Sequence, residues 1–272
     1  FALGGRTPAL SLTRHYRSDV AEAVANGGTP AARADGLLGI GWATNLDWKL
    51  DIDPAGDQIV VRGDAVGAVT FRKLDDDTWS GPEWLRMNLV ADGSEWLLTR
   101  PLGDGYRFDG DGRLEAVVDP QGHTMTLSWD GSDHLEGFTD AAGREAEVTT
   151  NGAGHITRID LPDGRYVTYG YSGAGFLTSV RMLDGETMSY VVDDRGRITK
   201  IKDPLNRTVL TSVYDGRGRV VRQSDALGQT TRFAYDRVNQ VTLTYGPRGG
   251  VTMTCVNPDG TTAATLDALG GT

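Results

Sequence analysis

Apolar and polar positions repeat every 21 residues from about residue 106 to the end of the chain. Within each unit, apolar residues lie two and five positions after a turn glycine, as Leu114 and Val117 do after Gly112. This spacing departs from strict alternation and predicts a strand with a bulge. The second half of the unit alternates regularly, as at Leu127 and Trp129, and predicts an ordinary strand. Two strands of about seven residues and two turns fill the unit, so we expect antiparallel hairpins and no helix.

Turn-forming residues mark this period twice in each unit. Every exception to glycine in the two series is Asp or Asn, the other residue types that tolerate positive φ. We therefore expect one backbone turn to recur along an all-β array of about eight units. One interval in each series is 22 residues, and we expect the extra residue within 207–213 to form another bulge. The first series is Gly112, Asp133, Gly154, Gly175, Gly196, Gly218, Asn239 and Gly260, and the second is Gly122, Gly143, Gly164, Gly185, Asn206, Gly228, Gly249 and Gly270.

An aromatic residue followed by an acid precedes the first turn in the clearest units. We expect the acid to accept backbone N–H groups within the turn. The aromatic residue ends the preceding strand, and we expect it on the apolar side of the sheet. These pairs are Phe108 and Asp109, Trp129 and Asp130, Tyr214 and Asp215, and Tyr235 and Asp236.

Residues 1–105 do not carry the repeat, and we expect them to form a β-rich cap before the array of residues 106–272. A cap is needed because the end of a repeat array exposes unpaired strand edges. Strand-like runs are Pro8–Tyr16, Leu46–Ile52, Gln58–Arg62, Ala68–Lys73, Trp84–Leu89 and Glu95–Arg100. Residues 19–26 fit either one or two helical turns or a loop running to Asp35.

Composition narrows the class of protein. The net charge of −10 argues against nucleic-acid binding, which needs a basic face. No apolar run approaches the roughly 20 residues that span a bilayer. Cys255 is the only cysteine, so a disulfide framework is excluded, and its strand-like setting favours a packing role. Because the chain begins at Phe1 and stops just after a repeat turn, we expect it to be a piece of a longer protein.

These motifs resemble the YD-repeat, or Rhs, family, whose unit reads roughly Tyr-Asp-x-x-Gly-Arg-Leu followed by Asp-Pro-x-Gly. The best copies are Tyr214–Val220 and Phe108–Leu114, the latter followed by Asp119–Gly122. The resemblance covers about residues 106–272. The segments Pro8–Ser18 and Gly39–Trp42 are also similar to the region that precedes the repeats in that family.

The resemblance implies a scaffold. In Rhs proteins, teneurins and the cocoon of insecticidal Tc toxins, such repeats form a sheet that spirals into a hollow shell. In the bacterial toxins the shell encloses a C-terminal effector, so the expected partners are that effector and a secretion or delivery machinery. The expected location is secreted or at the bacterial cell surface. Asp119–Gly122 shares letters with the self-cleavage motif of the family but occupies an ordinary turn, so we assign it no protease role.

Other chemistry has weaker support. Asp193 and Asp194, or the run 75–77, could form a glycosidase-like carboxylate pair, but acids in turns are expected to be solvated. A catalytic pair also needs environments that separate the two pKa values. His134 and His155 occupy equivalent positions in adjacent units and raise the hypothesis of a metal site, although the unit usually has Arg there. We expect no enzyme activity, metal or cofactor.

The arginines of the repeat suggest a structural role and leave a second function open. We expect the Arg residues after the turns to pair with Asp residues of neighbouring hairpins. These are Arg113, Arg197 and Arg219 after the first turn, with Arg144, Arg165 and Arg207 after the second. The alternative function is a cell-surface adhesion or carbohydrate-binding array. An exposed aromatic row would favour that alternative over a shell.

Overall fold

A computed structural model describes residues 1–2, 8–27, 35–63, 67–76, 78–256 and 262–267. Strands take up 53% of the chain and helices 5%, which confirms an all-β fold. The chain divides into an N-terminal subdomain, residues 1–186, and a C-terminal subdomain, residues 187–272, and each is described by itself. That division differs from the expected one into 1–105 and 106–272, which stays a prediction about the sequence repeat.

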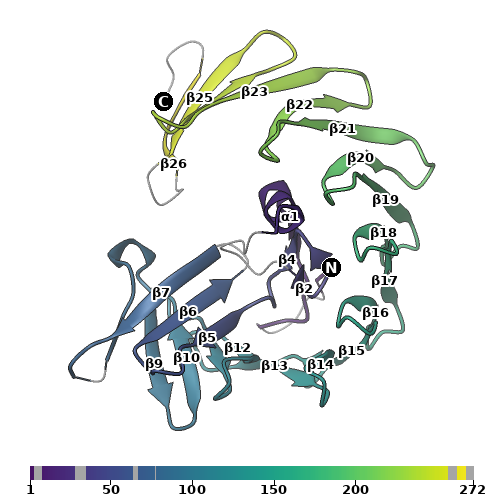
Figure 1. The fold of residues 1–272 in the computed structure, drawn as a ribbon. Helices are drawn as coiled ribbons and strands as arrows, with labels where there is room; N and C mark the ends of the chain where they lie inside the picture. The colour runs from purple at the N-terminus through teal and green to yellow at the C-terminus, as the bar shows by residue number, and fades with distance from the viewer. Residues whose placement is uncertain (3–7, 28–34, 64–66, 77, 257–261, 268–272) are drawn as a thin grey trace. The chain divides into compact units, whose positions relative to one another are not determined.

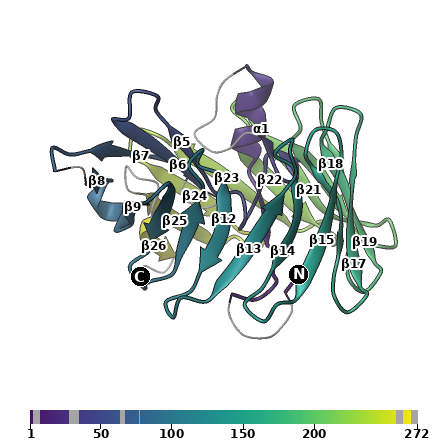
Figure 2. The ribbon, with the colours of Figure 1, turned by 90° about the horizontal axis from the view of Figure 1, so that it is seen from below.

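The N-terminal subdomain contains a long antiparallel sheet in which each strand pairs with the next along the chain. In Figure 2 its strands β12–β15 lie side by side. The sheet takes in two strands from the expected cap, β9 and β10, because Arg100–Asp104 already forms a repeat-type turn with Gly103 at φ 86°. The strands are β9 (Asn88–Asp92), β10 (Glu95–Thr99), β11 (Gly105–Phe108), β12 (Leu114–Val118), β13 (Thr124–Trp129), β14 (Leu135–Thr139), β15 (Glu145–Thr150), β16 (Ile156–Asp160), β17 (Tyr166–Tyr171) and β18 (Leu177–Arg181).

In this sheet the predicted bulge lies in the strand that follows the first turn of a repeat. Arg107 pairs with Ala116 but Phe108 pairs with Leu114, so Glu115 is the extra residue. The same shift recurs in the hairpins β13–β14, β15–β16 and β17–β18. This bulge explains the apolar spacing of two and five after the glycine, because the extra residue restores both apolar side chains to one face.

The strands of the C-terminal subdomain pair in the same antiparallel pattern. The expected second bulge within 207–213 is also confirmed: Ile201 pairs with Leu210 and Lys202 with Thr208, which leaves Val209 as the extra residue. The strands are β19 (Thr187–Val192), β20 (Ile198–Lys202), β21 (Thr208–Tyr214), β22 (Val220–Asp225), β23 (Thr230–Asp236), β24 (Val241–Tyr245), β25 (Val251–Val256) and β26 (Thr262–Asp267).

The hairpin β23–β24 departs from the repeat. We expected the left-handed turn residue at Asn239, and this is wrong: Gln240 holds it, at φ 53°. Asp236 pairs with Val241 and Tyr235 with Thr242 without the usual register shift. Because successive side chains of a strand point to opposite faces, Leu243 therefore lies on the face opposite Tyr235.

The N-terminal segment combines a small sheet, short strands and a helix. The open alternative at residues 19–26 is settled as the helix α1 (Ser18–Ala25). Two expected strands are confirmed only at their ends. Of the run Pro8–Tyr16 only Arg14–Tyr16 forms a strand, and Ser11 contributes a bridge to Ala2. Of the run Trp84–Leu89 only the last two residues lie in β9, because Trp84 lies in the 3₁₀ turn η1 (Glu83–Leu85). The strands are β1 (Arg14–Tyr16), which pairs with β4 (Trp42–Thr44), β2 (Asp35–Gly36) with β3 (Gly39–Ile40), and the sheet of β5 (Lys49–Ile52), β6 (Gln58–Gly63), β7 (Gly67–Lys73) and β8 (Trp79–Ser80).

This segment packs against the side toward which β12–β18 curve (Figure 1). Phe1 stacks on Phe138 with ring centroids 6.4 Å apart. The Ile156 N–H donates to the Leu37 carbonyl at 2.8 Å, so backbone as well as side chains hold the contact. Phe138, Ile159 and Val180 are fully or almost fully buried beneath it. The cap thus supplies the cover that the apolar face of the first repeats requires.

Candidate functional site

The functional feature that recurs most often is a five-residue turn. In the first copy, the Gly112 N–H donates to the Asp109 carbonyl at 3.0 Å, and the Asp109 N–H donates to the Arg113 carbonyl at 3.0 Å. The Asp109 side chain accepts the N–H groups of Asp111 and Arg113 at 3.1 and 2.8 Å. Gly112 has φ 82°, a conformation that costs other residues about 1–2 kcal/mol. The acid therefore organises the turn and the glycine permits it.

The same geometry recurs at the positions expected from the sequence. Glycines 112, 122, 143, 154, 164, 175, 185, 196, 218, 228 and 249 all have φ between 76° and 88°. Asp133 and Asn206 take the equivalent place at φ 63° and 62°. The acids Asp130 and Asp215 accept turn N–H groups as Asp109 does, whereas Asp236 does so in the altered turn before Gln240. Gly260 and Gly270 lie outside the described residues.

The charge pairs differ from our expectation. Most turn arginines pair with the acid of their own turn rather than with a neighbouring hairpin, because the turn places residues one and five side by side. Arg113 does both, since its guanidinium also contacts Asp133 of the next unit. Arg165 pairs with Asp163 at 2.7 Å. The pairs within one turn are Asp109 with Arg113, Asp140 with Arg144, Asp193 with Arg197, Asp203 with Arg207, and Asp215 with Arg219.

Asp140 has the most enclosed of these carboxylates, with a side chain that is 0% exposed. Burial raises its pKa, but the N–H groups of Ala142 and Arg144 and the Arg144 guanidinium outweigh burial, so the pKa lies below its ordinary value. The same balance lowers the pKa of Asp193 and of Asp215. A carboxylate held ionised in this way stabilises the turn and is a poor proton donor.

The aromatic residue of each pair links one unit to the unit before it. The Trp129 Nε1–H donates to the Leu114 carbonyl at 2.8 Å. The hydroxyl groups of Tyr171, Tyr214 and Tyr235 donate in the same way to the carbonyls of Ile156, Ile198 and Val220, at 2.6–2.7 Å. We call these four hydrogen bonds the aromatic ladder. Phe108, which has no polar atom to contribute, is fully buried instead.

The arginine of the earlier unit packs on the ladder ring of the later one. Arg197 lies 5.1 Å from the centre of the Tyr214 ring, and Arg219 lies 4.4 Å from that of Tyr235. Cation–π contacts of this kind contribute about 0.5–1 kcal/mol at exposed sites. Sequence reasoning placed the rings on the apolar side but missed their hydrogen bonds. The available signal was the choice of Tyr and Trp over Phe, since a half-buried ring with a polar atom needs a partner.

The two histidines each face the next turn. A Cβ atom on Gly154 would lie 2.8 Å from the His134 ring, and the His155 ring is buried 5.4 Å from that of Tyr171. Within the described residues no three His, Cys, Asp or Glu side chains form a cluster that suits a metal. Asp193 belongs to a turn ion pair, and the free Cys255 is half-buried in β25. Of the run 75–77, residue 77 lies outside the described part.

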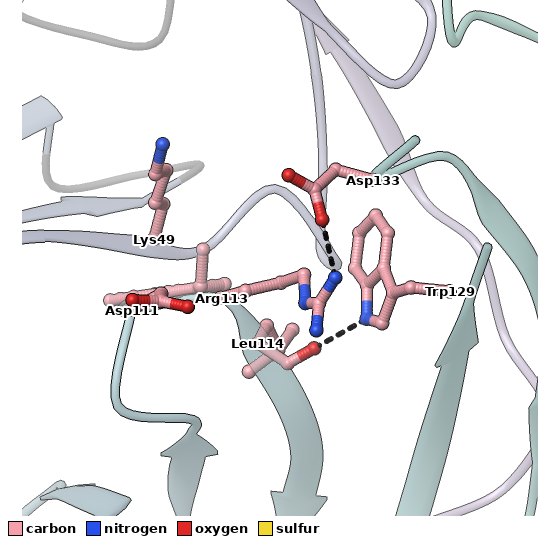
Figure 3. Close-up of a pocket in the computed structure, with 7 residues that line it drawn as sticks. Lys49, Asp111, Arg113, Leu114, Trp129 and Asp133 are labelled. Carbon is pink, nitrogen blue, oxygen red and sulfur yellow. Dashed lines mark hydrogen bonds and ion pairs between the residues drawn. The ribbon is translucent and has the colours of Figure 1, made fainter. Parts of the chain in front are cut away.

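A pocket of about 180 Å³ lies where the cap meets the first repeats (Figure 3). Strand β5 reaches the first turn here. The backbones of Lys49 and Arg113 form an isolated antiparallel β-bridge, and the Leu50 N–H donates to the Gly112 carbonyl at 2.8 Å. Lys49 and Trp129 stand on opposite sides of Arg113.

The remaining walls of this pocket are mixed in character. Asp111 and Asp133 contribute carboxylates, while Leu114 and Trp48 contribute apolar surface. The Trp48 ring stacks on Tyr106 at 4.1 Å and is 3% exposed. We call this site the junction pocket.

Comparison with known proteins agrees with the repeat geometry. A family model described as RHS Repeat matches residues 151–187 and 214–251, and one described as Domain of unknown function (DUF6531) matches residues 1–71. No curated protein matches the chain. No helix in the described part is long and apolar enough to cross a membrane.

Two solved structures of much longer chains are similar in part. A crystal structure of TcdB2-TccC3 without its hypervariable C-terminal region is 16% identical, with a TM-score of 0.40, over 78% of this chain and 12% of that chain. A Photorhabdus luminescens Tc holotoxin pore with a mutation in TccC3 is also 16% identical, with a TM-score of 0.33, over 78% of this chain and 11% of that chain. The present chain thus spans a small part of either length.

Proposed function

This chain is an Rhs/YD-repeat protein, and from that premise we propose that it is a wall segment of a shell. The shell encloses a C-terminal effector domain of the same polypeptide and helps to deliver it. In this proposal the repeats act physically: they separate an inactive cargo from the surroundings until delivery. The delivering partner is a secretion machinery, and the protein is secreted or attached to the bacterial surface.

The observation that carries the proposal is the aromatic ladder. Each ladder bond joins a unit to the one before it with the same atoms, as Tyr214 does to Ile198 and Tyr235 to Val220. A wall built in this way extends by repetition, because a unit with a ladder ring bonds to a backbone carbonyl that the unit before it offers in the same place. In the units before Tyr214 and Tyr235 an arginine also packs on that ring. Such regularity suits a barrier.

The carboxylates support a structural role over a catalytic one. The turn acids Asp193 and Asp215 are paired with arginines and share one kind of environment, with the pKa of each lowered. A catalytic pair would require two carboxyl groups whose environments shift their pKa values in opposite directions. We therefore propose that any enzymatic activity belongs to the effector.

The ladder also favours a shell over an adhesion array. Tyr171, Tyr214 and Tyr235 are half-buried, and their hydroxyl groups are occupied by backbone carbonyls. A carbohydrate-binding array would need a row of rings exposed on one face. The rings of this ladder instead pack beneath the side chains of the preceding unit, such as Arg197 and Arg219.

Limited proteolysis of the natural full-length product, followed by intact-mass analysis, tests the proposal. We expect a resistant shell that retains its C-terminal domain until denaturant is added. Gly218→Val should open the wall, because valine is strained at φ 76°, and should make that domain digestible. Gly216→Val is the matched control in the same turn, since Gly216 has no positive φ and no atom near its Cβ position. A C-terminal domain cleaved freely under native conditions would contradict the proposal.

A further inference from the structure

Charge is distributed unevenly between the two subdomains. Residues 187–272 carry 11 Lys and Arg against 8 Asp and Glu, a net charge of +3, whereas residues 1–186 carry 16 against 29, a net charge of −13. The total of −10 therefore conceals a basic C-terminal subdomain. Opposite charges concentrated in separate parts of a chain can each attract a partner locally.

Basic side chains gather on the face of the C-terminal sheet that lies opposite the ladder rings. Arg222 of β22 is the register partner of Arg232 of β23, which lies three residues from the ladder ring of its own strand. Lys200 of β20 shares this face, since its partner is Thr211 and the next partner across the sheet is Ser224. All three basic side chains are exposed. We call Lys200, Arg222 and Arg232 the basic face.

No acid of the same subdomain neutralises this face from within a strand. Each acid in the described part of the subdomain lies in a turn or is the last residue of a strand. No ion pair of Arg222 or Arg232 is found among the described residues. Like charges that stand directly opposite each other on neighbouring strands are destabilising, so the arginine pair is unfavourable in a single chain.

The row of residues that contains the two arginines has the composition of a contact surface. It continues with Val213 beside Arg222 and with Tyr245 beside Arg232, and these two side chains are 37% and 41% exposed. Arginine and tyrosine are enriched at protein interfaces relative to the rest of the surface. The row therefore suits a protein partner that carries carboxylates.

The N-terminal subdomain offers carboxylates of this kind. Glu145 and Glu147 of β15 are exposed and flank Ala146, which is fully buried, so both carboxylates lie on the face opposite the core. No ion pair of either glutamate is found in the part of the chain that the structure describes. Arg158 of the neighbouring strand β16 pairs with Asp160 instead. We call Glu145 and Glu147 the acidic face.

We propose that these two faces bind each other in different copies of this chain, with the basic face of one copy on the acidic face of the next. The two glutamates lie two residues apart on one strand, a separation of about 7 Å. Arg222 and Arg232 lie about 5 Å apart on neighbouring strands, a difference that the long arginine side chains accommodate. Two carboxylates then relieve the repulsion between the arginines and can accept paired hydrogen bonds from them.

A second copy fits the basic face better than other anionic partners do. Nucleic acid or an anionic membrane would extend beyond three basic side chains and meet a chain with a net charge of −10. A second copy brings two carboxylates on a sheet face of the same repeat geometry. Because the two faces differ, contact is head to tail, and a dimer retains one free face of each kind and can add further copies. This association does not depend on whether the protein encloses a cargo.

Sedimentation velocity of the natural full-length product over a range of protein concentrations tests the proposal. We expect species larger than the monomer at about 20 mM NaCl, and association weakened at least about tenfold at about 500 mM NaCl, because salt screens exposed charges. Arg222→Glu combined with Arg232→Glu should abolish association, and so should Glu145→Lys combined with Glu147→Lys. An equimolar mixture of these two double variants should associate again, because opposite charges then face each other at both contacts.

Arg217→Glu combined with Arg237→Glu is the matched control. Both arginines are exposed in turns, beside β22 and β23, and the control changes the net charge by the same amount. It should leave association unchanged, and circular dichroism establishes that each variant is folded. A product that stays monomeric at low salt up to about 100 μM would overturn the proposal. So would salt-dependent association that Arg222→Glu with Arg232→Glu leaves intact, or a mixture of the two double variants that stays monomeric.

Discussion

Gly112 and Leu50 meet backbone to backbone: the Leu50 N–H donates to the Gly112 carbonyl at 2.8 Å, and a Cβ atom on Gly112 would collide with the Leu50 carbonyl oxygen. This turn is therefore one point at which the cap contacts the first repeat through its backbone. Gly122 has the same left-handed conformation, at φ 83°, but nothing lies near its Cβ position. A comparison of the two glycines therefore separates the strain of the left-handed backbone from the crowding against Leu50.

Gly112→Ala should destabilise the protein more than Gly122→Ala. Both lose about 1–2 kcal/mol from the left-handed backbone, and Gly112→Ala loses a further 1–3 kcal/mol, roughly, because Leu50 must move. Urea unfolding of the two variants measures the difference. Equal losses in unfolding free energy would show that the cap does not bear on this turn.

Tyr235→Phe tests the aromatic ladder within the C-terminal subdomain. The change leaves the Val220 carbonyl without its donor, and we expect a loss of about 1 kcal/mol in unfolding free energy. Tyr245→Phe is the control, since the Tyr245 side chain is 41% exposed and no hydrogen bond to it is found in the described part of the chain. Its effect should stay within about 0.5 kcal/mol. An equal loss of unfolding free energy for Tyr245→Phe and Tyr235→Phe would show that the ladder hydrogen bond does not stabilise the protein.

Gln240→Gly should stabilise the protein, because Gln240 holds φ 53° where glycine is free of strain. Relief of about 1–2 kcal/mol is offset by about 0.4–1 kcal/mol of added freedom in the unfolded chain. The net gain should appear as a higher thermal midpoint. Arg237→Gly, in the same turn but without positive φ, should lower the midpoint. A lower midpoint for Gln240→Gly would place the left-handed residue elsewhere.

Acid should weaken the turns through carboxylates such as Asp140. Its pKa in the folded protein is below the ordinary value, so its contribution to stability is present above about pH 4, the unfolded pKa, and is lost as pH falls through the folded pKa. Asp140→Asn should therefore lower the unfolding free energy most at neutral pH, with the gap to the unsubstituted protein narrowing toward pH 3. Urea titrations from pH 7 to pH 3 measure this gap. The exposed Asp75→Asn should give a small gap throughout, and a constant gap for Asp140→Asn would contradict the ion-pair explanation.

The local geometry could be predicted from the sequence because it depends on residues close together. Positive φ is a property of single positions, so the Gly, Asp and Asn series located the turns. The irregular apolar spacing predicted the bulge found at Glu115, and the 22-residue interval predicted the one found at Val209. Contacts made through backbone atoms gave no such signal. The bond between Ile156 and Leu37 can be formed by any residues at those positions, and the ladder bonds end on carbonyls that every residue has.

Register errors arose where two alternatives differ by a single residue. Asn239 and Gln240 are adjacent, and the sequence favours Asn because its side chain tolerates positive φ better. The structure places the turn one residue later, and strand pairing without a bulge then decides which face Leu243 occupies. We likewise expected the turn arginines to pair with acids of neighbouring hairpins, whereas most pair with the acid of their own turn. Both acids are within reach, as Arg113 demonstrates with Asp109 and Asp133.

Electron cryomicroscopy of the natural full-length product tests the central claim most directly. We predict a continuous wall of antiparallel hairpins, with the repeats of this chain forming part of it and separate density enclosed on the inside. The enclosed density should disappear from a product truncated after the repeats, while the wall remains. An open ribbon with no enclosed density in the full-length product would contradict the assignment of these repeats to a shell.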